Sequence, residues 1–404
     1  MIEIGNKTNC CGCGACVAAC PKNALRLEAD ENGFEYPSLD ESLCIKCGLC
    51  SRVCAYQRRD GDARGSKKIT YAADASGIKR ELSASGGVFA GLARDFLNSG
   101  GVVFGSVLEY RDGHLCIYHQ SISQIEDLPR LQGSKYVQSA INQTYAVARD
   151  KLNGGEKVLF SGTPCQIAGL YGFLGREYDN LFTIDIVCHG VPSEQLFLDY
   201  IKNEEKKQNG KIVDYRFRDK SQGWKLHGKM MLLDESGEAK ELYFEPEESS
   251  YYQLFLNGYT YRENCYFCPY AGENRTGDLT LGDFWGIEIV QPELLCETGG
   301  PLDGKEGISC LIVNTEKGQR LLDLSPNVRL FESTFENAQR YNGQLRGPSQ
   351  LKPERETVLS LYRLGYGKVE KWYMRKLTVI KARRSIRKAV PQWVKKAIRK
   401  AIKQ

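Results

Sequence analysis

The chain has 404 residues, of which 42% are hydrophobic and 26% are charged. These proportions are those of a globular protein, so a wholly disordered or fibrous chain is excluded, and the length predicts two or three domains. No run approaches the ~18 consecutive apolar residues of a membrane-spanning helix, and the N-terminus has no apolar core of a signal peptide, so we expect a cytoplasmic protein.

Residues 1–60 contain nine of the sixteen cysteines, and eight of the nine form two runs with the spacing C-x2-C-x2-C-x3-C. This spacing is typical of bacterial ferredoxins, so we expect an α+β, ferredoxin-like module here. In bacterial ferredoxins the fourth cysteine of each run binds the cluster of the other run. The spacing therefore predicts one [4Fe–4S] cluster on Cys10, Cys13, Cys16 and Cys54, and a second on Cys44, Cys47, Cys50 and Cys20.

Zinc is the alternative metal for these cysteines. Zinc sites usually use two spaced pairs rather than two identical tetrads, which disfavours zinc. Cys11 does not fit the spacing and is interpreted as a bystander thiol. Residues 61–68 are small, polar and basic, and we interpret them as a linker.

Residues 69–345 predict an α/β domain. Short β-rich runs alternate with helical patterns that repeat apolar residues at intervals of three and four, and this order favours a sheet that is at least partly parallel. The predicted strands are 100–108, 157–162, 180–188 and 307–314. The predicted helices are 88–97, 140–152 and 194–207.

Two glycine-containing turns in this region are typical of ligand sites. Ser85, Gly86 and Gly87 precede a predicted helix, where free N–H groups form either an anion site or an ordinary helix cap. Gly162 and Thr163 follow a predicted strand and open a helix, which is a common ligand position in α/β sheets. Lys135 adds a cation that is either a ligand partner or a solvated surface lysine.

The motifs SGGVF, GSKYVQS, SGTPCQ, CHGVPS, CxxCP and GDFWG occur in this order. With them, residues 1–345 resemble the beta subunit family of hydrogenases and dehydrogenases that reduce a deazaflavin, coenzyme F420. The resemblance implies an FAD beside the iron–sulfur clusters, with a second redox partner stacked on the flavin. It places the FAD diphosphate near Ser85, Gly86, Gly87, Gly162 and Thr163, with Lys135 as a phosphate or ring partner.

Four further cysteines occur in these motifs: Cys165, Cys188, Cys265 and Cys268. They predict a third [4Fe–4S] cluster, and a zinc site or separate buried thiols stay open as alternatives. His189 is a weak catalytic candidate, either as a proton donor or as a further ligand. The alternative is a histidine that only packs against its neighbours. Asp283 is another, either orienting a site or capping a turn.

Residues 346–404 are predicted to form a basic helical tail. Residues 368–404 contain fourteen Lys or Arg and one acidic residue, Glu370. Apolar residues repeat at three and four after Pro391, which predicts an interfacial helix on an anionic membrane surface at the inner face of the membrane. A solvated or partner-bound helix is the alternative. No motif favours nucleic acid as a partner.

The preferred hypothesis is an iron–sulfur flavoprotein oxidoreductase. Two [4Fe–4S] clusters would pass electrons to or from FAD, which exchanges a hydride or electron pair with a deazaflavin or a small substrate. One alternative is a membrane-associated reductase of a sugar or lipid-linked intermediate. The other is a non-catalytic electron-transfer subunit that docks on a redox partner protein.

Overall fold

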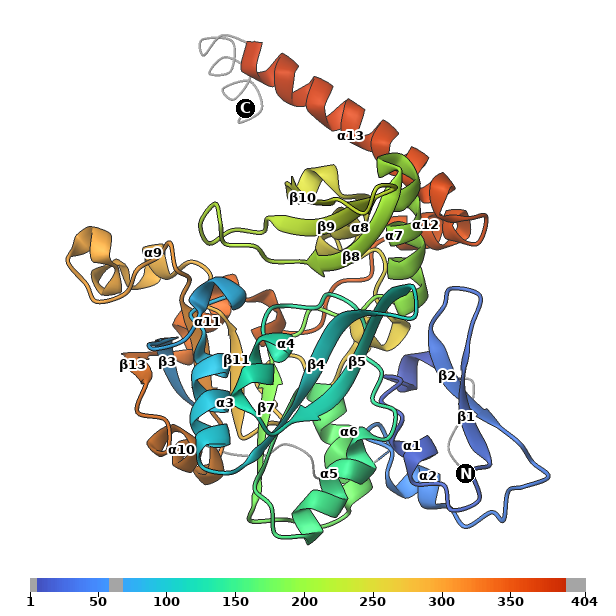
Figure 1. Ribbon diagram of the computed structural model, residues 1–404, viewed down its shortest axis with the longest axis vertical. Helices are drawn as coiled ribbons and strands as arrows, with labels where there is room; N and C mark the ends of the chain where they lie inside the picture. The colour runs from blue at the N-terminus through green and yellow to red at the C-terminus, as the bar shows by residue number, and fades with distance from the viewer. Residues whose placement is uncertain (1–5, 58–67, 390–404) are drawn as a thin grey trace, which may run out of the picture.

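The structure is a computed structural model that describes residues 6–57 and 68–389. An N-terminal module, a central α/β unit and a smaller lobe pack against one another (Figure 1). The module lies beside α5 and α6, and the smaller lobe lies above β4 and β5 in this view. The N-terminal module and the α/β unit are therefore distinct parts of the fold that pack against each other.

The N-terminal module contains a short antiparallel hairpin and two one-turn helices. Each helix begins directly after a glycine in the left-handed conformation, Gly14 or Gly48, both with φ of 73°. The equivalent glycine in each cysteine run shows that the two runs fold in the same way. The elements are η1 (Lys7–Asn9), α1 (Ala15–Ala18), β1 (Leu25–Ala29), β2 (Glu35–Leu39) and α2 (Leu49–Arg52).

The central unit is built on an eight-stranded mixed sheet with the order β13-β3-β12-β11-β7-β6-β4-β5. The inner strands β4, β6, β7 and β11 are parallel, and the outer pairings are antiparallel. This confirms a partly parallel sheet. The strands are β3 (Ile69–Ala75), β4 (Val102–Arg111), β5 (His114–Ile122), β6 (Val158–Gly162), β7 (Leu181–Ile186), β11 (Leu279–Asp283), β12 (Ser309–Val313) and β13 (Val328–Ser333).

Both faces of this sheet are covered, because successive strand residues point to opposite sides. In β6, Leu159 joins the apolar cluster under α3, whereas Val158 and Phe160 join the cluster under α5 and α6. The latter also includes Ala15 of the N-terminal module, which fixes the module to the body. The helices are α3 (Val88–Asn98), α4 (Leu128–Leu131), α5 (Thr144–Asn153), α6 (Pro164–Leu174), α9 (Ile287–Val290), α10 (Glu316–Asp323) and α11 (Phe335–Tyr341).

One predicted helix starts later than expected. The pattern predicts 140–152, but α5 begins at Thr144. Ala140 instead forms a bridge with Tyr118 of β5, and Asn142 has a φ of 47° that a helix does not allow. Seven 3-10 turns complete the central unit and the lobe: η2 (Arg80–Leu82), η3 (Ile125–Asp127), η4 (Pro246–Glu248), η5 (Glu263–Phe267), η6 (Pro292–Leu294), η7 (Cys296–Thr298) and η8 (Gly343–Leu345).

The smaller lobe has its own antiparallel sheet, β10-β9-β8, and its own aromatic core. The core includes Tyr200, Tyr215, Phe217 and Tyr251, whose rings contact one another. The elements are α7 (Glu194–Gln208), β8 (Gly210–Arg216), β9 (Gly228–Asp234), β10 (Ala239–Phe244), α8 (Ser250–Leu256), α12 (Glu354–Tyr362) and α13 (Tyr366–Ala389).

The predicted boundary at residue 346 does not coincide with a structural boundary. Val358 in α12 and Val369 in α13 are buried in the core of the smaller lobe, and Tyr373 and Leu377 are also buried. Beyond these residues α13 extends away from the body (Figure 1). The helix predicted after Pro391 lies outside the described residues. Within the described ranges, no helix is both long and apolar enough to span a bilayer.

Candidate functional site

The predicted motifs come together around one cavity of about 310 Å³, at the lower end of the size range of ligand pockets. Strands β6, β7 and β11 are parallel, and the residues at or just after their carboxyl ends border this cavity. Ligands in α/β sheets commonly bind at this edge. The predicted residues that line it are Ser85, Gly87, Lys135, Gly162, Thr163, Cys165, Cys188, His189 and Asp283.

Gly86 is the predicted cofactor residue that does not line the cavity. A Cβ added at this position would lie 2.6 Å from the carbonyl oxygen of Ala73 and 3.0 Å from the backbone nitrogen of Ser309. Gly86 is therefore needed for packing against strands β3 and β12. The sequence interpretation of this glycine as an approach point for phosphate stays a prediction, and the packing of Gly86 is a separate reason for a glycine here.

The N-terminus of α3 borders the cavity through Gly87, Val88 and Phe89. Gly87 is the N-cap residue, with a φ of 80°, and no side chain caps the helix. The first N–H groups of an uncapped helix lack intrahelical partners and attract anions. This end of the cavity therefore offers backbone N–H groups to an anion.

Thr163 has a different local role. It caps α6 through a reciprocal interaction with Gln166, and its hydroxyl oxygen lies 3.2 Å from the sulfur of Cys165. The hydroxyl thus serves the helix and the neighbouring thiol. The Gly162–Thr163 turn therefore forms part of the cavity wall, and the Thr163 hydroxyl contacts Cys165.

Lys135 is half-buried in the cavity wall, so the solvated-surface alternative does not describe it. Its ammonium donates to the carbonyl oxygens of Gln132 at 2.8 Å and Arg130 at 3.2 Å. Burial lowers the pKa of Lys135 to about 7. A lysine with this pKa changes its charge near neutral pH.

His119 borders the cavity, although no motif in the sequence contains it. Its ring is buried, and its nitrogens lie 2.7 Å from the Ser139 hydroxyl and 3.1 Å from the Ser161 carbonyl oxygen. Burial lowers the pKa of His119 to about 4, which keeps the imidazole neutral. The alternation expected of a strand along 114–122 could have indicated that His119 faces the interior, on the same side as Leu115 and Ile117.

The two weak catalytic candidates have different environments. Asp283 accepts a 2.8 Å hydrogen bond from the buried guanidinium of Arg218, which in turn lies 5.4 Å from the ring of Trp285. Burial lowers the pKa of His189, and its ring nitrogens form no hydrogen bond with any residue in the described ranges. His189 therefore borders the cavity with its proton-transfer atoms uncommitted.

The first predicted tetrad is brought together. Cys10, Cys13, Cys16 and Cys54 line one small cavity of about 50 Å³, together with Tyr36 and Tyr56. The fourth cysteine comes from the second run, as the crossing pattern predicts. Burial raises the pKa of Cys10, Cys16 and Cys54, so thiolates here require a positive partner such as metal.

The second tetrad lies on the outer side of the module. Cys20 and Cys50 contact the same apolar cluster, and the sulfur of Cys20 accepts a hydrogen bond from the backbone of Ala24 at 3.3 Å. Cys47 is exposed. Leu43 and Ile45, next to it in sequence, are also exposed, at 49% and 58%.

The third group is also assembled. The thiols of Cys188, Cys265 and Cys268 each interact electrostatically with that of Cys165. Burial raises the pKa of Cys188 to about 12 and of Cys268 to about 11. A cluster, a zinc site and separate buried thiols stay the three interpretations of this group.

Cys11 lies between the first and third groups. Its thiol interacts by hydrogen bonding with Cys13 of the first group and Cys165 of the third, and it borders both cavities. The hydrogen bond from Cys11 is the main reason that the pKa of Cys165 is lowered to about 7. Cys11 therefore lies between the two predicted ligand groups, and whether it is a ligand or a bystander thiol stays a prediction.

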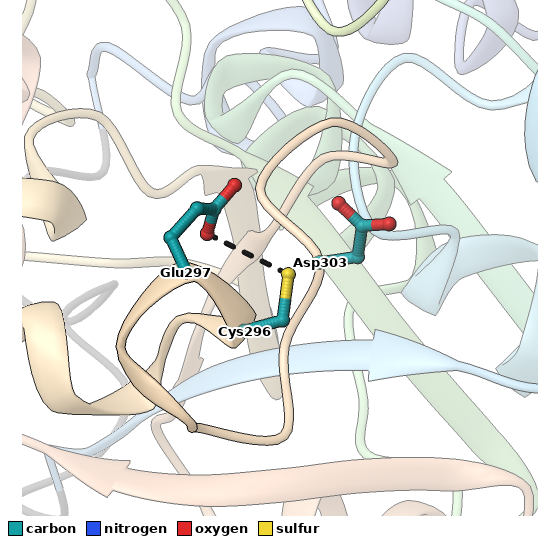
Figure 2. Close-up of side chains that lie close together, drawn as sticks. All are labelled: Cys296, Glu297 and Asp303. Atoms are coloured by element: carbon teal, nitrogen blue, oxygen red, sulfur yellow. Dashed lines mark hydrogen bonds between the residues drawn. The ribbon is translucent and has the colours of Figure 1, made fainter.

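Another cysteine lies beside two carboxylates far from these groups. Figure 2 shows Cys296, Glu297 and Asp303, with 3.6 Å between the Cys296 sulfur and a Glu297 oxygen. Cys296 and Glu297 are exposed, and Asp303 is half-buried. Exposed acidic groups of this kind are common, and we assign no role to them. Cys310 is buried in β12, as expected for a core residue.

Comparison with protein families gives two matches. Residues 155–333 match the family described as the C-terminal part of the beta subunit of coenzyme F420 hydrogenase/dehydrogenase. Residues 9–58 match a 4Fe-4S dicluster domain. Both matches agree with the resemblance drawn from the motifs.

Curated relatives come from Methanocaldococcus jannaschii. An uncharacterized protein is 26% identical over 44% of this chain and 56% of its own length. A coenzyme F420-dependent sulfite reductase is 27% identical over 49% of this chain and 30% of its own length. An uncharacterized ferredoxin is 39% identical over 13% of this chain and 65% of its own length. The chain thus matches about half of the length of the uncharacterized protein and about a third of the length of the sulfite reductase.

Among solved structures, the chain is similar to one from the F420-reducing [NiFe] hydrogenase complex of Methanosarcina barkeri. The match has 16% identity and a TM-score of 0.38, and it covers 76% of this chain and 91% of the other.

Proposed function

Because residues 155–333 match the C-terminal domain of the coenzyme F420 hydrogenase/dehydrogenase beta subunit and residues 9–58 match a 4Fe-4S dicluster domain, we propose that the protein is an iron–sulfur flavoprotein oxidoreductase. In this proposal FAD occupies the 310 Å³ cavity, and the cysteine groups hold [4Fe–4S] clusters that exchange electrons with it. A deazaflavin or a small molecule is the substrate that exchanges a hydride or electron pair.

The observation that carries the proposal is the contact between the cavity and the cysteines. Cys11, Cys165 and Cys188 form part of the cavity wall, and Cys11 also borders the cavity of the first tetrad. A cofactor in the larger cavity would therefore lie directly beside the cysteine groups. Such closeness has a chemical purpose in redox proteins but none in a purely structural metal site.

The residues present fit a flavin. A flavin supplies the exchange between paired and single electrons that clusters alone lack. The N-terminus of α3 would bind its diphosphate, and the buried Ser106 hydroxyl in the cavity wall, which has no hydrogen-bond partner among the residues that the structure describes, offers a polar contact. Lys135 would hold or release a proton at Nζ near neutral pH, whereas neutral His119 would only orient its neighbours.

The cysteine groups suggest an order for electron movement. The second tetrad lies outermost, with Cys47 exposed, and would meet a redox partner protein. In the first tetrad Cys16 is buried and the other three cysteines are half-buried, and Cys11 interacts with Cys13 of the first tetrad and Cys165 of the third group at the cavity wall. This order is the route along which single electrons would travel between a partner and the flavin.

Anaerobic purification followed by iron, sulfide and flavin analysis tests the proposal. Two clusters give about eight iron atoms and eight sulfides per chain, and a third gives about twelve of each. Stoichiometric zinc in place of iron contradicts the cluster assignment. Protein with iron but no flavin, even after incubation with FAD, contradicts the flavin site and leaves the electron-relay alternative.

A second assay separates an enzyme from a relay. We expect the isolated, loaded protein to reduce or oxidise a deazaflavin with a chemical electron acceptor or donor in steady turnover. Electron transfer that occurs only when another subunit is added would contradict the enzyme and support a non-catalytic relay. Whether the protein is an enzyme or a relay, a redox partner protein would dock on the exposed surface around Cys47.

The distal part of the chain supports a further proposal, contact with an anionic membrane surface. Of residues 368–404, fourteen are basic and one is acidic, and that acidic residue is buried in the body. After its first turns, which pack on the smaller lobe, helix α13 extends away from the rest of the molecule as far as Ala389 (Figure 1). A projecting basic helix is favourable near anionic lipid headgroups. In this form the protein acts in the cytoplasm at the membrane surface.

A further inference from the structure

Arg262 is a guanidinium in the protein interior, with 0% of the residue exposed. Its Nε donates to the carbonyl oxygen of Cys10 at 2.9 Å, and its Nη1 donates to Oε1 of Gln138 at 2.9 Å. Nη2 donates to the carbonyl oxygen of Glu35, and the ring of Tyr36 lies 4.2 Å from the guanidinium. All of these partners are electrically neutral.

No carboxylate in the described ranges forms a salt bridge with Arg262. A buried cation without a counter-ion carries a large desolvation penalty. The ionisable groups nearest to this guanidinium are the Tyr36 phenol and the thiols of Cys10, Cys11 and Cys265, which are neutral as free side chains because their pKa values are raised. Cys10 belongs to the first tetrad and Cys265 to the third group, so a negatively charged cluster at these cysteine sites would supply the missing counter-charge.

We propose that Arg262 is the counter-ion of the cluster on Cys10, Cys13, Cys16 and Cys54 and sets the reduction potential of that cluster. The inference rests on the proposed clusters. A [4Fe–4S] core held by four thiolates is anionic, and accepting one electron adds one negative charge. A buried cation stabilises this reduced form more than the oxidised form, strongly so in a low-dielectric interior. Arg262 therefore raises the potential of the inner cluster.

Arg262 also fixes the position of the first cysteine loop. Gly12 has a φ of 65°, and a Cβ added there would lie 2.8 Å from Cζ of Arg262 and 2.6 Å from Nε2 of Gln138. Nε2 of Gln138 donates to the carbonyl oxygens of Cys11 and Gly12 at 3.2 and 3.3 Å. The loop is held against these two side chains, so the charge stands at a constant distance from the cluster.

The test uses three variants of the full chain, purified anaerobically: Arg262→Gln removes the charge, Arg262→Lys keeps it, and Gln138→Glu neutralises it with a carboxylate in hydrogen-bond range. Midpoint potentials are measured by redox titration with electron paramagnetic resonance. The outer cluster on Cys20, Cys44, Cys47 and Cys50, to which Arg262 makes no hydrogen bond, is the internal reference.

We expect a lower midpoint potential of the inner cluster in Arg262→Gln and Gln138→Glu, a potential near that of the parent protein in Arg262→Lys, and no shift of the outer cluster. Equal shifts in Arg262→Lys and Arg262→Gln, or no shift in Gln138→Glu, overturn the inference. If Arg262→Gln fails to fold, the midpoint potentials of the inner cluster in Gln138→Glu and Arg262→Lys still test the inference. Iron and sulfide analysis of the parent protein separates this outcome from failure of the proposed function, which would show as absent clusters.

Discussion

The ammonium of Lys207 in α7 donates a hydrogen bond of 2.5 Å to the carboxylate of Glu370 in α13, across 163 residues of sequence. Glu370 also accepts a hydrogen bond from the Ser250 hydroxyl and is buried. The first turns of α13 thus belong to the smaller lobe. A truncation that separates the tail from the body has to leave them in place.

A chain that ends at Gly367 loses Val369, Tyr373 and Leu377 from the core. Because burial of one such side chain contributes about 1.5–3 kcal/mol, we expect a decrease of several kcal/mol in the free energy of unfolding. A chain that ends at Thr378 keeps these residues and should unfold at nearly the same urea concentration as the full chain. Equal stability of the two truncated chains would contradict this packing role.

The same Thr378 truncation tests membrane contact. The full chain should sediment with anionic vesicles at low salt and be partly released at high salt, because each basic residue near the surface contributes about 1 kcal/mol that salt screens. The shortened chain should remain in the supernatant with its clusters and flavin. Neutral phosphatidylcholine vesicles are the control. Equal binding of both chains would exclude the tail as the contact.

The crossing pattern of the cysteines makes a paired prediction. Cys54→Ala should lower iron by about four atoms per chain and remove the inner cluster signal, whereas Cys20→Ala should remove the outer one. Cys310→Ala, in the core of β12, is the matched cysteine control and should keep all iron. If each variant instead loses the cluster of its own run, the crossing assignment is wrong.

Gly86 and Gly347 offer a matched glycine comparison. A methyl group at Gly86 would lie 2.6 Å from a backbone oxygen, whereas at Gly347 nothing lies within 4 Å. We expect Gly86→Ala to decrease the free energy of unfolding by about 1–3 kcal/mol through overpacking, and Gly347→Ala to have little effect. Thermal unfolding of cofactor-free protein measures both. A direct phosphate role would instead show as weaker FAD binding at unchanged stability.

Lys135 predicts a pH dependence. Its pKa is about 7 in the folded chain against an ordinary value of 10.5, so between these pH values the unfolded chain binds more protons. The contribution of Lys135 to stability therefore rises with pH across this window, and it is least favourable below pH 7. Lys135→Met should remove that rise, measured as the difference in melting temperature from the parent protein. An identical pH profile for both proteins would contradict the buried position.

The same titration should affect anion binding. Lys135 is charged below a pH of about 7 and neutral above it. FAD affinity should consequently fall as pH rises through this value in the parent protein and stay level in Lys135→Met. Riboflavin, which has no diphosphate, is the control ligand and should show no such step.

Much of what could be predicted about the fold and the site came from signals that are local in the sequence. Cysteine spacing is a local constraint, and it predicts that Cys54 joins the first run, with which Cys54 shares a small cavity. The strand and turn before Gly162 predicted a ligand position there, and the structure shows Cys188 and Asp283 at the same sheet edge, because parallel strands align their carboxyl ends. These inferences needed no knowledge of contacts between distant residues.

Contacts between distant residues account for what the sequence did not predict. Arg262 bonds to Cys10 across 252 residues, and neither residue type nor spacing indicates the pair. The place of Cys11 depends on how the module docks on α6, which adds Cys165 to its surroundings. Gly86 resembles a phosphate residue in the sequence because glycine serves close packing and ligand approach equally well, and only the fold shows its packing against the neighbouring strands.

Trp224 and Trp285 stack with ring centres 4.9 Å apart and an angle of 2° between planes, and Trp285 forms part of the cavity wall. Indole emission overlaps the absorption of oxidised flavins, so a flavin beside Trp285 would quench that emission by energy transfer. The chain has two other tryptophans, Trp372 and Trp393, both near its C-terminal end. Filling and emptying of the cavity can therefore be followed by intrinsic fluorescence in real time, without a label.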